Sequence, residues 1–243
     1  MVVLEDSGLE EYVLGEKTDI IVPVDIFVPD DGSGCVMTSY SCCADFVRTF
    51  DERYGGDPLS KEAYSFLSSK MSPFADALGY DADKKSHYTV VEYLFPHDGK
   101  LPDGAIIDGT RLFSSSEEAD GLKVLTLHGI DPDPDDDDDQ AAGFVIDGSI
   151  VACASINDYS DDGAVEINVE CAKKYRGCGY GTSCVALLVD HLTSRGFDVS
   201  YKCRETNKAS ARIAEKLGFR RVGRRMSYVC YLKQTERTDE NGV

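Results

Sequence analysis

The amino-acid sequence predicts an α/β fold, and the order of the elements after residue 141 is the main reason. That order is strand, strand, strand, glycine-rich loop, helix, strand, helix, strand, strand, because the apolar spacing alternates between the periods of strands and helices. The chain has 243 residues, of which 42% are hydrophobic and 28% are charged. This length and balance are typical of a globular protein that buries a core, and they exclude wholesale disorder.

Before residue 140 the pattern predicts a less regular set of elements. The predicted strands are 19–28, 88–95, 105–113 and 122–128, and the predicted helices are 42–54 and 61–71. Pro23 favours an edge strand or a bulge, and Pro73 predicts the end of the second helix. The charge run at 132–139 predicts a loop, because no regular element tolerates so many like charges.

Stronger local signals follow residue 141. Residues 143–155 predict two strands joined by a tight turn at Asp147 and Gly148, a residue pair that tolerates positive φ. Residues 164–170 alternate strictly, with apolar side chains on one face and polar side chains on the other. The remaining predictions are helices at 182–195 and 207–217, a strand at 198–203 and a hairpin at 219–232.

Charge is distributed unevenly along the chain. Residues 1–140 contain 31 Asp and Glu against 10 Lys and Arg, a net of −21, whereas residues 141–243 contain 13 against 15, a net of +2. A protein that binds duplex nucleic acid needs a strongly basic face, so nucleic acid is not the predicted partner. The acidic part instead favours a cationic ligand, and the mildly basic part favours an anionic one.

The sequence predicts a cytoplasmic protein without a membrane partner. No apolar run reaches the roughly 18–20 residues that cross a bilayer, and the acidic first residues do not resemble a signal peptide. The nine cysteines are an odd number, include the adjacent Cys42 and Cys43, and form no C-x-x-C motif. This usage is typical of reduced thiols.

No metal site is predicted. The four histidines show no ligand spacing; they are His87, His97, His128 and His191. The acidic run 131–139 does not fit a calcium loop, which needs Gly and Glu where this chain has Asp136 and Ala142. The run is therefore either a solvated loop or part of a site for a cationic molecule.

A glycine-rich segment, Arg176-Gly-Cys-Gly-Tyr-Gly181, lies between a predicted strand and a predicted helix. In such a turn the backbone N–H groups and the helix dipole converge on one point, and glycines let a phosphate approach the backbone closely. The spacing matches neither G-x-G-x-x-G nor G-x-x-x-x-G-K-[ST]. The segment therefore indicates either a phosphate site or a plain glycine-rich turn.

Together with two further segments, this loop resembles the GNAT superfamily of acetyl-CoA-dependent N-acetyltransferases. The loop fits the family's [RQ]-x-x-G-x-[GA] pattern, and the strand Ile167-Asn-Val-Glu-Cys171 precedes it at the family's offset. The third segment, Asn207-Lys-Ala-Ser-Ala-Arg-Ile-Ala-Glu-Lys-Leu-Gly-Phe219, is similar to the family's second helix. The resemblance covers about residues 143–232 and implies the GNAT acetyltransferase fold, a mixed central sheet flanked by helices, with an N-terminal extension or subdomain.

The resemblance also suggests how the chain is organised. Residues 1–100 are expected to be an N-terminal region of unrecognised family that includes the first strand and helices of the core. Residues 101–140 are expected to connect, with the acidic loop, to an acetyl-CoA-binding core at 141–243.

Site roles follow from the resemblance, position by position. The loop is expected to hold the CoA pyrophosphate through Arg176, Gly177, Cys178, Gly179, Tyr180, Gly181 and Thr182. The strand ending at Cys171 is expected to diverge from the strand at 199–203, so that the Cys171 N–H donates to the thioester carbonyl. Asn207 is expected to bind the pantetheine arm, with Ser210 near the sulfur or the phosphates.

The resemblance does not decide which groups accept and donate protons in the reaction. Glu170 and Glu166 share the polar strand face, and either carboxylate is a candidate base for the attacking amine. Many family members carry a tyrosine acid in the second helix, where this chain has Ala214. The alternatives are Tyr201, Tyr228, Cys203, a water, or a thiolate that leaves without help.

The expected function is transfer of acetyl from acetyl-CoA to a primary amine, with a polyamine or an aminosugar antibiotic as the cationic acceptor. Two alternatives are acetylation of a protein or peptide, and a CoA-binding module without catalysis, which Ala214 hints at. The sequence does not indicate an oligomeric state.

Overall fold

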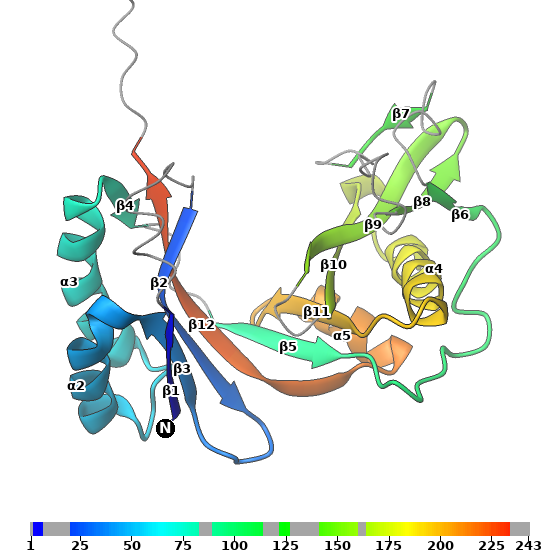
Figure 1. Ribbon diagram of the computed structural model, residues 1–243. Coiled ribbons are helices and arrows are strands. Elements are labelled where there is room, and N and C mark those ends of the chain that lie inside the picture. The colour runs from blue at the N-terminus through cyan, green and yellow to red at the C-terminus, as the bar shows by residue number, and fades with distance from the viewer. Residues whose placement is uncertain are drawn as a thin grey trace, which may run out of the picture. The chain divides into compact units, whose positions relative to one another are not determined.

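The structure is a computed structural model, and it describes residues 2–6, 20–82, 89–113, 122–126, 141–159 and 164–233. The chain forms two compact units, whose elements Figure 1 labels. Unit 1 comprises Met1–Val90 and Gly223–Val243, and unit 2 comprises Val91–Val222. The domain limits at 100 and 140 expected from the sequence stay a prediction. Among the described residues, no helix has both the length and the apolar character needed to cross a membrane.

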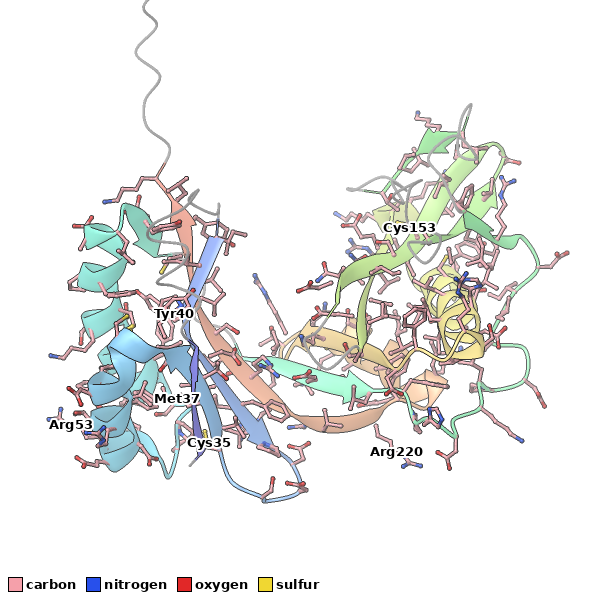
Figure 2. The ribbon with its side chains drawn as sticks, viewed as in Figure 1. Cys35, Met37, Tyr40, Arg53, Cys153 and Arg220 are labelled. Atoms are coloured by element: carbon pink, nitrogen blue, oxygen red, sulfur yellow. The ribbon has the colours of Figure 1, made fainter. Side chains whose placement is uncertain are left out.

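Unit 1 is a sheet with two helices on one face (Figure 1). The strand order is β1 (Val2–Asp6), β3 (Val36–Tyr40), β2 (Ile20–Pro29) and β12 (Arg220–Leu232), and β4 (Tyr80–Ala82) also pairs with β12. The helices are α2 (Ala44–Tyr54), which follows the 3-10 turn η1 (Ser41–Cys43), and α3 (Lys61–Ala77). Apolar side chains from the strands and both helices form the core, among them Met37 and Tyr40, which Figure 2 labels.

The prediction that a helix ends before Pro73 is wrong, because α3 continues through Pro73 to Ala77. A proline removes the backbone bond to the carbonyl four residues earlier, which here belongs to Ser69. Ser69 and Pro73 are both exposed, so water can solvate that carbonyl. Ala75, two residues after Pro73, is fully buried in the unit 1 core, and this burial favours continuation of the helix.

The hairpin predicted at 219–232 is also wrong, since Arg220–Leu232 form one long strand, β12. Gly223 lies inside this strand, where an added Cβ would lie 2.6 Å from the Phe27 ring and 2.6 Å from the Val28 carbonyl oxygen. The glycine therefore permits a close approach of β2 and does not form a turn.

Unit 2 contains a mixed sheet and two helices. The strand order is β5 (Val90–Leu94), β11 (Val199–Arg204), β10 (Val165–Cys171), β9 (Ser149–Tyr159), β8 (Ala141–Ile146) and β6 (Thr110–Phe113), with β7 (Lys123–Val124) paired to β9. β10 is parallel to β11, whereas β10 and β9, β9 and β8, and β8 and β6 are antiparallel. The helices are α4 (Tyr180–Ser194) and α5 (Lys208–Leu217), and the 3-10 turn η3 (Lys173–Tyr175) follows β10.

Unit 2 confirms the predicted α/β fold with a mixed sheet and flanking helices. The turn between β8 and β9 is the predicted one, with φ of 47° at Asp147 and 69° at Gly148. Two predicted strands are shorter than expected: β6 begins only at Thr110, and β7 has two residues. The acidic run 132–139 lies outside the described residues.

Candidate functional site

The parallel strands β10 and β11 diverge at their carboxyl ends, as the family resemblance implies. They pair over only three residues, from Val165 opposite Val199 to Ile167 opposite Tyr201. β10 then continues to Cys171, and β11 also continues beyond its last paired residue, with no mutual pairing along these fully described segments. We call the space between these two unpaired strand ends the opening.

The backbone of Cys171 directs its N–H into this opening. Val165 donates its N–H to the carbonyl of Asp198, the residue just before β11 (2.8 Å), whereas Ala172 donates its N–H to the Val151 carbonyl in β9 (2.9 Å). Successive N–H groups in a strand point to opposite edges. Because Cys171 is an even number of residues from Val165 and adjacent to Ala172, its N–H points toward the β11 edge. The predicted hydrogen-bond donor thus has a suitable direction.

The glycine-rich loop follows β10 and ends at the first turn of α4. Gly177 and Gly179 have φ of 81° and 88°, values that favour glycine, and Gly179 is the residue that caps α4. An added Cβ at Gly181 would lie 3.3 Å from Cγ2 of Val169, so this glycine lets the helix start approach β10 closely. The loop N–H groups and the helix N-terminus therefore lie at the end of the diverging strand, an arrangement that suits an anion.

Basic side chains lie in the loop and in the turn just before it. Arg176 donates its Nε–H to the Cys171 carbonyl (3.1 Å) and so ties the loop to the strand end. Lys173 and Lys174 in η3 are exposed. Burial raises the pKa of the Cys171 thiol, and the positive charge of Arg176 partly opposes that rise.

The other predicted loop residues differ in exposure. Cys178 is exposed, and Thr182 is half-buried. The Tyr180 ring stacks on Phe144 of β8, with 4.0 Å between ring centroids and an angle of 20°. Tyr180 therefore fixes the start of α4 against the sheet through its ring.

The start of α5 is capped by its own side chains. Asn207 Oδ1 accepts the Ser210 N–H (3.3 Å), and Asn207 Nδ2 donates to Ser210 Oγ (2.9 Å). Ser210 also forms a hydrogen bond with Tyr201 of β11. Asn207 is therefore engaged in a local cap, and its contact with pantetheine stays a prediction.

The structure separates the candidate acids. Ala214 lies one turn after Ser210, and its methyl side chain has no acidic proton to supply. Burial raises the pKa of Tyr201 to about 12, although its bond with Ser210 partly lowers it. Burial also raises the pKa of the Cys203 thiol. Tyr228 belongs to the unit 1 core, where its hydroxyl pairs with Ser72 (2.8 Å).

The two candidate bases share the polar face of β10 but have different partners. Glu166 Oε2 accepts from Lys202 Nζ of β11 (2.5 Å), and its Oε1 accepts from Asn157 Nδ2 of β9 (3.2 Å). The Glu166 and Lys202 side chains are only 17% and 25% exposed. Glu170 lies next to the strand end and opposite Cys153, which Figure 2 labels. Burial is the main cause of the raised pKa of Cys153, and the charge of Glu170 adds to it.

Sequence reasoning missed two sets of residues here. Lys202 is one, because its pairing with Glu166 depends on the register of β10 and β11. The other joins the segment before β6 to α4: Ser183 Oγ accepts the Ile107 N–H (2.8 Å) and lies 2.6 Å from Thr110 Oγ1. A serine on the apolar face of the predicted helix was the available signal for this second set.

Comparisons with known proteins found a family match and solved structures of similar fold. Residues 133–231 match the family of GNAT acetyltransferases. A GNAT-family protein from Novosphingobium aromaticivorans is similar in structure, with a TM-score of 0.50 and 19% identity, over 64% of this chain and 69% of that chain. This similarity shows a shared fold.

Two further solved structures are more distant. An N-acetyltransferase-like protein from Streptococcus suis has a TM-score of 0.45 and 17% identity, over 95% of this chain and 77% of that one. A protein from Salmonella typhimurium, solved with its cofactor acetyl-CoA, has a TM-score of 0.32 and 21% identity, over 42% and 69%. No curated protein matches the chain.

Proposed function

We propose that this chain, which carries a GNAT acetyltransferase domain at residues 133–231, transfers acetyl from acetyl-CoA to a primary amine of a small cationic molecule. The observation that carries the proposal is the opening between β10 and β11 beside the glycine-rich loop. An anionic head and an extended arm can both be held there, one by the loop and one by the strand edges.

The loop residues fit the phosphates of acetyl-CoA. N–H groups from Gly177 to Thr182 lie at the start of a helix of 15 residues, where the dipole favours negative charge. Lys173, Lys174 and Arg176 add positive charge around them. The strand edge fits the other end of the molecule, since the Cys171 N–H is directed into the opening.

Acetyl-CoA supplies an activated thioester carbonyl. The Cys171 N–H would donate to the carbonyl oxygen, where negative charge grows as the amine attacks. A nitrogen–carbon bond forms, the carbon–sulfur bond breaks, and the proton lost by the nitrogen passes to a carboxylate directly or through water. The main contributions of the protein are then orientation and charge stabilisation.

Glu170 is the better base of the two carboxylates. Both oxygens of Glu166 already accept hydrogen bonds, one of them from the ammonium of Lys202. Glu166 can take a proton only by weakening that ion pair. Glu170 lies at the strand end itself, adjacent to the Cys171 N–H.

The leaving group needs no side-chain acid in this proposal. A thiol has a pKa of about 8–9, whereas the pKa of Tyr201 is raised to about 12. Proton transfer from Tyr201 to the departing thiolate is therefore uphill. We infer that the thiolate leaves without a protein acid, or takes its proton from water.

The acceptor is proposed from charge. Residues 1–140 carry a net charge of −21, and such a potential concentrates cations. A polyamine or an aminosugar would gain from it in both encounter rate and residence time.

A thiol-release assay with a panel of acceptors tests the proposal. The panel contains polyamines, aminosugars, simple monoamines and peptides, each offered with acetyl-CoA. We expect release of free CoA to be fastest with a polycation. Preference for peptides would instead support acetylation of proteins. Binding of acetyl-CoA without turnover of any acceptor would indicate a non-catalytic module, to which Ala214 already points.

A further inference from the structure

A short segment before β6 covers the start of α4. Residues 107–110 form a tight turn, in which Thr110 donates its N–H to the Ile107 carbonyl (3.1 Å) and Gly109 has φ of 96°. Gly109 in turn lies on Phe144, since an added Cβ there would lie 3.5 Å from the ring. All of these residues belong to unit 2.

A buried serine holds this turn in place. Ser183 is fully buried in α4, and its Oγ accepts the Ile107 N–H (2.8 Å). Thr110 Oγ1 donates its only proton to the Ile107 carbonyl (2.8 Å), so the 2.6 Å contact between Ser183 and Thr110 has Ser183 as donor. Each polar group in this network is therefore satisfied, which is what a buried hydroxyl requires.

The network brings an apolar side chain to the glycine-rich loop. A Cβ added at Gly179 would lie 3.4 Å from Cδ1 of Ile107. Yet Ile107 remains 37% exposed, and its neighbour Ile106 is 40% exposed. An isoleucine is thus fixed against the glycine-rich loop, with part of its surface left for a further contact.

We propose that Ile107 belongs to the acetyl-CoA site, as an apolar wall against the phosphates that Ser183 holds in position. This inference rests on the proposed function. The wall excludes water from one side of the glycine-rich loop. This lowers the local dielectric constant and strengthens the hydrogen bonds from the loop N–H groups to the phosphates. The neighbouring Ile106 has no atom within 4 Å of a Cβ added at Gly179, and it is assigned no such role.

Substitutions at the two isoleucines test the proposal by acetyl-CoA affinity. Ile107→Asp places a negative charge against the phosphates, whereas Ile107→Asn changes size and polarity almost equally without charge. We expect a Kd at least about tenfold higher for Ile107→Asp, and about two- to fivefold higher for Ile107→Asn. High salt should reduce the difference in Kd between the two variants, because it screens the repulsion between the aspartate and the phosphates.

Ile106→Asp is the matched control, with the same charge one residue away, and it should bind acetyl-CoA as the wild type does. The melting temperature of each variant without ligand checks that it folds. If Ile107→Asp does not fold, Ile107→Ala is measured in its place. If wild type and folded Ile107 variants have the same Kd for acetyl-CoA, the role of Ile107 is overturned while the proposed function stands. The same holds if the Asp variants at Ile106 and Ile107 lose affinity equally. A wild-type chain that does not bind acetyl-CoA would overturn the proposed function as well.

Discussion

Glu166 and Glu170 lie four residues apart on one strand face, yet their neighbours give them different roles. Glu166 completes an ion pair with Lys202 across the last paired part of β10 and β11. Removing one partner from such a pair leaves the other charge half-buried and uncompensated, which destabilises the fold. Glu170 lies where the two strands have separated, and it is therefore the carboxylate expected to act on the reacting amine.

Glu170→Gln should separate the two roles. Glutamine keeps the shape of the side chain but cannot take a proton, so kcat should fall roughly 10²–10⁴-fold while the Kd for acetyl-CoA stays the same. Steady-state kinetics and calorimetric titration measure the two quantities. Glu166→Gln is the control, for which we expect a lower melting temperature because Lys202 loses its charged partner. If Glu170→Gln retains full activity and Glu166→Gln does not, the base assignment is reversed.

The start of α4 is the element whose conformation the proposed cofactor site depends on most. Gly179 combines a left-handed backbone with a close neighbour, Ile107, on the side where a Cβ would lie. Any side chain there is strained by the backbone conformation, and its Cβ lies in van der Waals contact with Ile107. A glutamate adds negative charge where the phosphates are expected.

Gly179→Glu should therefore abolish the rise in melting temperature that acetyl-CoA gives to the wild type by binding the folded state. Gly148→Glu is a matched control, because Gly148 also has positive φ (69°) and has open space around it, in the turn between β8 and β9. That variant should show the same backbone strain but keep the ligand-induced shift. An undiminished shift in Gly179→Glu would remove the loop from the cofactor site.

Elements with strong local signals could be predicted from the sequence, and elements that depend on distant partners could not. The turn at Asp147 and Gly148, the alternation in β10 and the end of the α5 helix at Leu217 each have a local cause in backbone conformation or periodicity. β12 was predicted as a hairpin because its partner β2 lies at the other end of the sequence. Pro73 was read as a helix end because the burial of Ala75 is a tertiary effect.

The candidate site shows the same division. The loop motif was visible in the sequence, and the divergence of β10 from β11 was implied only by the family resemblance. The Glu166–Lys202 pair and the contact of Ile107 with Gly179 arise from strand register and from a turn that no motif marks. The residue types thus indicated which chemical groups were present, and tertiary contacts such as the Glu166–Lys202 pair distinguished between candidates of the same type, Glu166 and Glu170.

Both units bury free thiols, and this makes the whole molecule sensitive to alkaline pH. Burial raises the pKa of Cys35 to about 11 and those of Cys43 and Cys230 to about 12 in unit 1. Burial raises the pKa of Cys184 in unit 2 as well. In the unfolded chain these thiols ionise near 9. The folded state therefore holds protons that the unfolded state has lost, and stability falls as pH rises above 9.

We expect the free energy of unfolding to be nearly constant between pH 7 and 8, and to fall by about 1.4 kcal/mol per pH unit for each such thiol between its unfolded and folded pKa. Denaturant titrations at a series of pH values measure this slope. Cys184→Ala should make the slope shallower, although the cavity lowers stability at every pH. Cys178→Ala, which removes an exposed thiol, should leave the slope unchanged. If replacing the buried cysteines leaves this slope unchanged, groups other than these thiols cause the loss of stability at alkaline pH.

The overall charge of the chain leads to a prediction about the acceptor. The net charge of −21 on residues 1–140 attracts cations by long-range forces, which are screened over about 8–10 Å at physiological ionic strength. The apparent KM for a polyamine or an aminosugar should therefore rise steeply with salt, while the KM for a monoamine should rise little. Initial rates over a range of salt concentrations measure both, with the Kd for acetyl-CoA determined at each concentration to separate the effect on the anionic cosubstrate.

Replacing the five aspartates at 135–139 with asparagine identifies how much of this effect comes from the acidic run, which the structure does not describe. If the run borders the acceptor site, the variant should have a higher KM for the polycation at low salt and a weaker salt dependence. The KM for the monoamine should not change, which guards against a general loss of folding. A KM for the best polycation that is independent of salt, together with no effect of the five replacements, would contradict the cationic acceptor, because the charge of the first 140 residues would then contribute nothing to catalysis.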